Sequence, residues 1–360
     1  MFSDLPFIFR FISVFIFVIN ISVSASATAS TESDHQSVGS KADVIALSID
    51  NDLFFPGGAD RDYTAGFALT FSGAGVRPLW GWPERFLKIL DCCSNRGPDS
   101  IATANQINSF EFGGYGFTPD EIREENTRPT DRPYASLLYI SFGRTDYDID
   151  SASAWTSSFA VGMLGLDVFK AAQNRVHKTI GSDVAAGWEH QISEGGELTL
   201  RYQRAYHQYW EAHLVPGHYK TTYFGSVGYL TEVGVAFATR HGTISSPDYR
   251  FNPELISYGE RTGELLPPSN GNKESYFWGG LAVKLRLYNA FLQGQFRSSD
   301  HTLGGHDVRR LVVDAWVGYT RSFGRDFQFS YVLRGNTSEI KRGEGDRSMF
   351  WGGFVLSHNI

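Results

Sequence analysis

Two acidic segments near the start of the chain carry the oxygen ligands that a hard cation prefers. Ser-Ile-Asp-Asn-Asp spans 48–52, and Asp-Arg-Asp-Tyr-Thr spans 60–64. If both are ends of β-strands, the period-2 alternation points Ser48, Asp50 and Asp52 to the interior, with Asp62 and Thr64 beside them. Such an oxygen-rich pocket suits Ca²⁺. A polar turn at the end of two strands, where Asp and Asn are common, explains the same residues.

A histidine lies in the one stretch with helical spacing, 166–193. Four apolar residues recur there at every fourth position: Val168, Ala172, Val176 and Ile180. Gly181 provides a stop, and Gln173 and His177 share one helical face beside the apolar stripe. Asp183, beyond the glycine, can turn back toward that face. An imidazole can act as a general base near neutral pH, although a lone histidine in an amphipathic helix is more often a solvated or core residue.

An arginine precedes a strand in Thr-Asp-Arg-Pro-Tyr-Ala-Ser, residues 130–136. The guanidinium of Arg132 could bind a substrate phosphate with two hydrogen bonds. Equally, Asp131 and Arg132 could only complete a turn. The segment by itself does not separate these interpretations.

Several function classes are disfavoured by composition and by missing motifs. A net charge of −7 lacks the basic face that nucleic-acid binding needs. The sequence contains no G-x-S-x-G, H-E-x-x-H, P-loop or C-x-x-C motif, which argues against cofactor-dependent redox and nucleotide chemistry. Cys92 and Cys93 are adjacent, so they cannot join distant elements.

The chain begins with an apolar run that ends in Ala25-Ser26-Ala27, a pattern typical of signal-peptidase cleavage. We therefore expect residues 1–27 to be a secretory signal, 28–42 a flexible lead-in and 43–360 the folded domain. No later apolar stretch reaches the roughly 18–20 residues of a membrane-spanning helix. The 53 aromatic residues and 38 glycines instead suit a membrane barrel, with a secreted β-sandwich as the alternative.

Period-2 alternation over most of the mature chain predicts an all-β fold, an antiparallel transmembrane β-barrel of about 12 strands. In 62–71, the face from Tyr63 to Phe71 suits lipid, while Thr64 belongs to the polar, interior face. Asn51 alternates with Asp52 and should face outward unless the strand ends or bulges there. Thirteen strand candidates appear, although bacterial barrels have an even number, so 12 or 14 is expected. They lie near 44–50, 62–72, 108–115, 135–147, 155–165, 197–209, 219–229, 231–239, 275–287, 289–297, 311–323, 325–335 and 347–357.

Five segments, in this order, resemble the lipid A 3′-O-deacylase family of Gram-negative outer membranes. They are IDND (49–52), DRDYTAG (60–66), TDRPYAS (130–136), QNRVHKTIG (173–181) and TSEIKRGEGDR (337–347). The resemblance implies a twelve-stranded barrel with a calcium-dependent site between the wall and a short helix. It implies a hydrolase that removes the 3′-linked acyl or acyloxyacyl group of lipid A, with lipopolysaccharide and outer-membrane lipids as partners. We expect the chain to act as a monomer.

The resemblance also assigns residues to roles. His177 corresponds to the base, Asn51, Asp52 and Thr64 to residues needed for activity, and Asp183 to an acidic residue that is expected to be Glu. Asp52, Thr64, Asp183 and Gln173 are the expected ligands of Ca²⁺. Arg132, Arg175 and Lys178 are candidates for binding the glucosamine phosphates. A non-enzymatic channel or lipopolysaccharide-binding barrel would have the same alternating strands, whereas a serine phospholipase would need a Ser–His motif that is not recognisable here.

Overall fold

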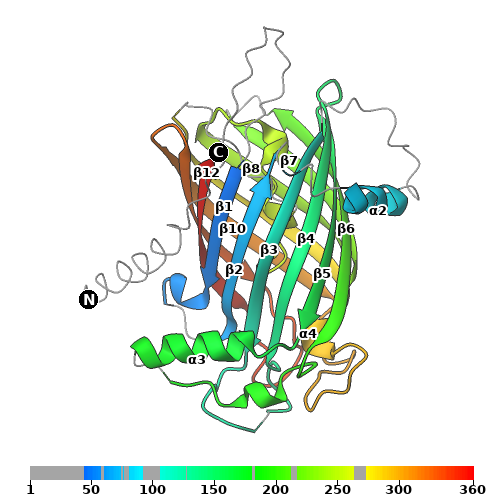
Figure 1. Cartoon of the computed structure of the whole chain (residues 1–360), viewed down its shortest axis with the longest axis vertical. Coiled ribbons are helices and arrows are strands. Elements are labelled where there is room, and N and C mark those ends of the chain that lie inside the picture. Colours follow the sequence, from blue (N-terminus) through cyan, green and yellow to red (C-terminus); the bar gives the residue numbers. More distant parts are fainter. Residues whose placement is uncertain are drawn as a thin grey trace. The chain divides into compact units, whose positions relative to one another are not determined.

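Twelve antiparallel strands form a closed barrel in the computed structural model of the chain (Figure 1). The structure describes residues 44–57, 61–73, 76, 81–91, 106–126, 128–180, 183–211, 217–262 and 273–360. The expected signal segment, the lead-in and both cysteines lie outside the described residues. Each strand pairs with its sequence neighbours, and β1 closes the barrel against β12.

The strands have the following bounds: β1 Val44–Asn51, β2 Asp62–Ser72, β3 Gln106–Thr118, β4 Ala135–Asp148, β5 Ser153–Leu164, β6 Glu197–Glu211, β7 His218–Gly228, β8 Leu230–Thr243, β9 Ser275–Asn289, β10 Leu311–Phe323, β11 Phe327–Asn336 and β12 Met349–Asn359. The helices are α2 Gly81–Asp91, α3 Val168–Ile180 and α4 Ala290–Gln293, with short 3-10 helices η1 Asp52–Phe54, η5 Gly187–His190, η6 Asp248–Arg250 and η7 Pro253–Leu255.

Twelve of the thirteen predicted strands are confirmed, and the candidate 289–297 is wrong. The chain there turns into the short helix α4, because the Asn289 side chain accepts a hydrogen bond from the Phe291 amide at 3.0 Å. Gly294, with φ +70°, then ends the turn. Short-range alternation therefore could not distinguish a strand from a capped helical turn at the barrel rim.

Alternation places the side chains of β1 as predicted. The outward positions are half-buried, and the inward ones, such as Ser48 and Asp50, are buried. In β2, Ala68 and Thr70 are likewise buried, and the Thr70 hydroxyl donates to Glu111 at 2.7 Å. The inner faces of β1 and β2 thus carry polar side chains into the lumen, as expected for a membrane barrel.

A segment of the β8–β9 connection fills the lumen. Every residue from Arg250 to Thr262 is buried. Arg261 donates to Asp50 at 2.8 Å, and Glu260 accepts from Arg201 at 3.1 Å. Buried charges survive in a low-dielectric interior only when they are paired, so these contacts fix the segment to opposite parts of the wall.

Helix α2 packs on the outside of the barrel wall (Figure 1). The Phe86 ring contacts Phe159 with centroids 4.7 Å apart. Asp91 pairs with Arg144 at 2.9 Å and with Arg204 at 2.7 Å. Because Arg204 lies on the outward face of β6, the carboxylate neutralises a positive charge on the outer side of the wall. None of the helices within the described ranges is long and apolar enough to cross a membrane.

Candidate active site

Helix α3 also lies on the outer face of the wall, near one end of the barrel (Figure 1). Phe112 is 38% exposed and lies on the outward face of β3. Gly114 and Gly116, two and four positions later, lie on the same face. A Cβ atom at either glycine would come within 3.0 Å of the Phe169 ring of α3. The two glycines therefore leave the space that lets the helix lie against the strand, and the helix covers this part of the outer wall.

A β-bulge changes the faces of two residues of β2. The pairing with β3 shifts between Tyr63 and Ala65, so Thr64 is the extra residue. Tyr63 is fully buried and its ring contacts Trp351 in the interior cluster, with centroids 5.1 Å apart. The prediction that Tyr63 faces lipid is wrong, because strict alternation does not hold across a bulge.

The bulge brings Thr64 to the outer face. Its hydroxyl lies 2.6 Å from that of Thr118. Thr118 follows Gly116 by two positions on β3, which puts it on the outward set of side chains. The interior position predicted for Thr64 is therefore also wrong, and its hydroxyl lies on the side of the wall that α3 covers.

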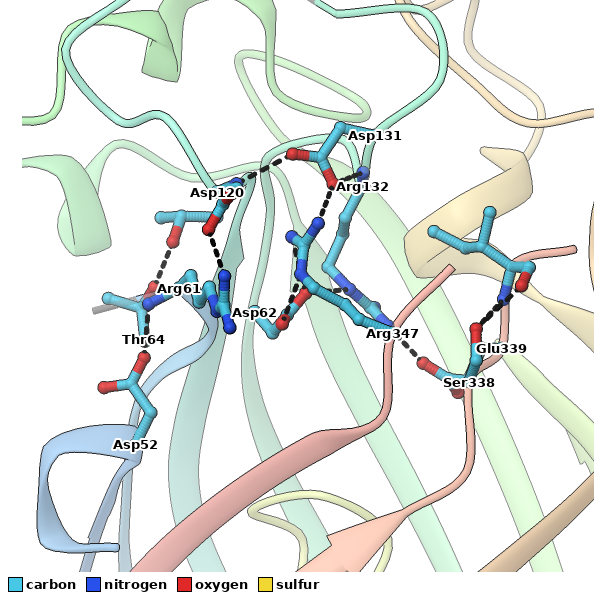
Figure 2. Close-up of polar contacts among 12 residues, drawn as sticks. Asp52, Arg61, Asp62, Thr64, Asp120, Asp131, Arg132, Ser338, Glu339 and Arg347 are labelled. Atoms are coloured by element: carbon cyan, nitrogen blue, oxygen red, sulfur yellow. Dashed lines mark hydrogen bonds and ion pairs between the residues drawn. The ribbon is translucent and has the colours of Figure 1, made fainter. Parts of the chain in front are cut away.

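Asn51 ends β1, and Asp52 follows it as the first residue of η1. Asp52 lies beside Thr64 (Figure 2). The Asn51 amide donates to the Thr64 carbonyl and accepts from the Leu53 amide at 2.7 Å, which caps η1. Asp52 is 1% exposed and accepts from the Arg61 amide at 2.6 Å. Asp52 begins η1 and does not continue β1, so strand alternation does not fix its direction.

The face of α3 toward the wall contains Phe169, Gln173 and His177, spaced by four residues. The prediction that Gln173 and His177 share one face is confirmed, and this face is buried, since Gln173 is 7% exposed and His177 5% exposed. The predicted apolar stripe is offset, because Val168 and Ala172 are exposed. The side chains of Val176 and Ile180 lie outside the described part of the structure.

The chain returns from α3 along the same helix face. The His177 ring contacts the Asp183 carbonyl through Nδ1, and the Trp188 indole donates to Gln173 at 2.7 Å. Because a carbonyl oxygen can only accept, Nδ1 carries the hydrogen and Nε2 is the basic nitrogen. The fold thus holds the imidazole in one tautomer against the barrel wall.

The charged candidates fall into two groups. Arg175 and Lys178 are exposed on the side of α3 away from His177. Arg132 is buried and ion-paired with Glu339 and, at 3.5 Å, with Asp62, so its guanidinium is not available to a phosphate in this structure (Figure 2). Its predicted substrate role gains no support from the geometry.

Sequence reasoning missed the ion-pair cluster around Arg132, because its members come from strands and loops that are far apart in the sequence. Arg347 pairs with Asp62 and with Asp131, each at 2.8 Å (Figure 2). Burial acts to raise the pKa of Glu339, but Arg132 and Arg286 outweigh it and hold that pKa below its usual value. The cluster ties the β3–β4 and β11–β12 connections together beside the candidate site.

The expected calcium ligands are only partly gathered. The Asp183 side chain is 51% exposed and pairs with Arg123, while its backbone carbonyl contacts His177. Within the described ranges, no three His, Cys, Asp or Glu side chains form a group that could hold a metal ion. A cation here would depend on the Asp52 carboxylate together with neutral oxygens of Thr64 and Gln173, which are hard donors of the kind calcium accepts.

The family of the chain follows from comparison with known proteins. A family model described as outer membrane protein LpxR matches residues 11–360. The chain belongs to the LpxR family. LpxR from Salmonella typhimurium has a similar structure, with a TM-score of 0.67 and 18% identity over 88% of this chain and 99% of that chain. The twelve-stranded barrel and the outer-membrane location predicted from the sequence are thereby confirmed.

More distant barrels are also similar in part. An outer membrane channel from Pseudomonas putida F1 has a TM-score of 0.44 and 8% identity, covering 92% of this chain and 100% of that chain. A search of curated proteins gives no match. Membership of the LpxR family supports a lipid A deacylase of the outer membrane, in agreement with the resemblance of the five segments.

Gly116→Val is expected to displace α3 from the wall. The added side chain would meet Phe169 at 3.0 Å and Trp188 at 3.4 Å. Trypsin should then cut α3 faster at Arg175 and Lys178, while the barrel keeps the heat-dependent shift of folded barrels in gel electrophoresis. Gly225→Val is the matched control, since its Cβ would be no nearer than 3.5 Å to a neighbour. Equal cleavage of the two variants would contradict the docking role of Gly116.

Proposed function

We propose that the chain is a calcium-dependent hydrolase that removes the 3′-linked acyl or acyloxyacyl group from lipid A. The observation that carries the proposal is His177, a histidine in a fixed tautomer on an outer-wall helix of an LpxR-family barrel. A base on the outer face can meet an ester that stays in the membrane leaflet. Asn51 and Thr64 on the same face are the residues that the five-segment resemblance assigns to activity.

His177 acts as general base in this mechanism. Nε2 takes a proton from water as the water oxygen bonds to the ester carbonyl carbon. In the second step the carbon–oxygen ester bond breaks, and the proton passes from Nε2 to the departing sugar oxygen. The products are a free fatty acid and a free sugar hydroxyl.

Hydroxyl groups and proposed calcium ligands at the rim of the wall support the reaction. Of the paired hydroxyls of Thr64 and Thr118, one donates to the other, which leaves one hydroxyl hydrogen for the substrate. Asp52, Thr64 and Gln173 are the proposed holders of Ca²⁺, with Asp183 joining if its side chain leaves Arg123. Calcium, when bound, supplies positive charge that stabilises a negative oxygen developing on the ester carbonyl.

Substrate phosphates would bind on the exposed side of α3. Arg175 and Lys178 lie there, and cationic side chains near a lipid surface bind phosphates electrostatically. A channel is the rival function. It is disfavoured because the residues from Arg250 to Thr262 occupy the lumen and are fixed by ion pairs to the wall.

Expression in the outer membrane of a host with fully acylated lipid A tests the proposal. The lipid A mass should fall by that of the 3′-linked acyl or acyloxyacyl group, and fragmentation spectra should place the loss on the 3′ position. Loss from another position would contradict the 3′ assignment alone. An unchanged lipid A beside a folded barrel would contradict the enzyme, and steady conductance in planar bilayers would favour the channel.

A further inference from the structure

Asn174 of α3 is bound to the returning chain by two reciprocal hydrogen bonds. Its side-chain amide donates to the Ala185 carbonyl at 3.3 Å, and its side-chain oxygen accepts from the Ala185 amide at 3.1 Å. One short side chain therefore satisfies both backbone groups of one residue. Among the common residue types only an amide offers a donor and an acceptor side by side in this way.

The position of Ala185 decides where the Asp183 carbonyl lies. The two residues are separated by Val184 alone, so a backbone fixed at Ala185 leaves little freedom at Asp183. The Asp183 carbonyl is the group that contacts Nδ1 of His177. On its other side the segment is held by the Ala186 amide, which donates to the Ile122 carbonyl at 2.8 Å.

We infer that Asn174 is a positioning residue for the base. It holds the return segment so that the Asp183 carbonyl binds Nδ1–H of His177, and it thereby selects the tautomer in which Nε2 accepts a proton. The inference rests on the proposed function of His177. Asn174 itself is half-buried, and its amide is engaged by Ala185, so it acts through the segment and not on the substrate.

Kinetics of purified enzyme in micelles form the first part of the test. For Asn174→Ala, kcat should fall by about 100-fold, the effect of a displacement of roughly 1 Å at a reacting group. KM should stay within about twofold, because substrate contacts are unchanged. Thr179→Ala is the control. Its hydroxyl bonds within α3 on the exposed side, so kcat should not change.

The second part measures the tautomer directly by ¹⁵N NMR of protein labelled at histidine, with the His177→Gln variant identifying the signal among the ten histidines. The Nδ1-protonated form should dominate in the wild type and mix with the other tautomer in Asn174→Ala. If the Asn174→Ala variant does not fold, Asn174→Asp, whose side chain has the same shape, is used in its place.

A kcat within about threefold of wild type, or a lower kcat with an unchanged tautomer, overturns the inference. A wild-type enzyme without deacylase activity would instead overturn the proposed function, and the spectra would still test the tautomer.

Discussion

His177→Gln is expected to lower kcat/KM for deacylation by about 10²- to 10⁴-fold. Glutamine keeps an N–H that can donate to the Asp183 carbonyl, so the fold around α3 should persist. It has no basic nitrogen to take the proton of the attacking water. The measurement is the time course of lipid A mass in micelles containing purified enzyme.

The control for this variant is His306→Gln. His306 lies on the β9–β10 connection, its side chain is 79% exposed, and it has no role in the proposed chemistry. Its substitution should leave the time course unchanged. If His177→Gln hydrolyses lipid A within a few-fold of the wild-type rate, another residue must be the base.

Asp52→Asn is expected to have the second largest effect, through the metal. Removing the carboxylate leaves only neutral oxygens among the proposed ligands near the rim, and Ca²⁺ affinity depends on ligand charge. Loss of a residue that only orients a metal ligand typically lowers metal affinity by about 10- to 100-fold. Asp52 is a proposed direct ligand, so the calcium concentration for half-maximal activity should rise by more than this. Titration of chelator-treated enzyme with Ca²⁺ gives this value.

Asp120→Asn provides the matched control. This carboxylate lies near the same rim but is exposed and ion-paired with Arg61 at 2.8 Å (Figure 2). Although partial burial opposes it, Arg61 holds the pKa of Asp120 below its usual value. An exposed pair of this kind contributes little, so the calcium dependence should be unchanged. Activity that survives a chelator in the wild type would contradict the calcium requirement and leave the hydrolase itself untouched.

Most of the barrel could be predicted from the sequence, because a wall with lipid on one side and polar groups on the other imposes period-2 alternation. That alternation located every strand from β1 to β12. It also produced the false candidate at 289–297, where Asn289 and Gly294 cap a helical turn. Alternation reports only whether neighbouring residues are apolar or polar. It carries no information on the hydrogen bond by which Asn289 caps the helical turn at Phe291.

The candidate site was less predictable. Thr64 was assigned to the interior because a bulge adds one residue without any signal in the alternation of β2. The buried face of α3 differs from the predicted apolar stripe for another reason. Phe169 packs on Gly114 and Gly116 of β3, and the helix sequence alone does not show this contact. The glycine spacing of β3 was a usable signal, because two outward glycines two positions apart mark a place where something packs on the wall.

Ion pairs across the lumen could not be predicted at all. Arg261 and Asp50 are 211 positions apart, and the short segment that contains Asp50 carries no signal of its partner. The same holds for Arg132, whose position before a strand suggested an exposed phosphate ligand. Its pairing with Glu339, 207 positions away, depends on the closure of the barrel.

One unpaired residue in β2 decides on which side of the wall the Thr64 hydroxyl stands. From Gly66 onward, β2 keeps its register with β1. Deleting Tyr63 would close the bulge and turn Thr64 into the lumen, away from His177. A related barrel that lacked this one residue would therefore not present the threonine hydroxyl to the histidine. In a sequence alignment the same difference would look like a one-residue change in the length of a loop.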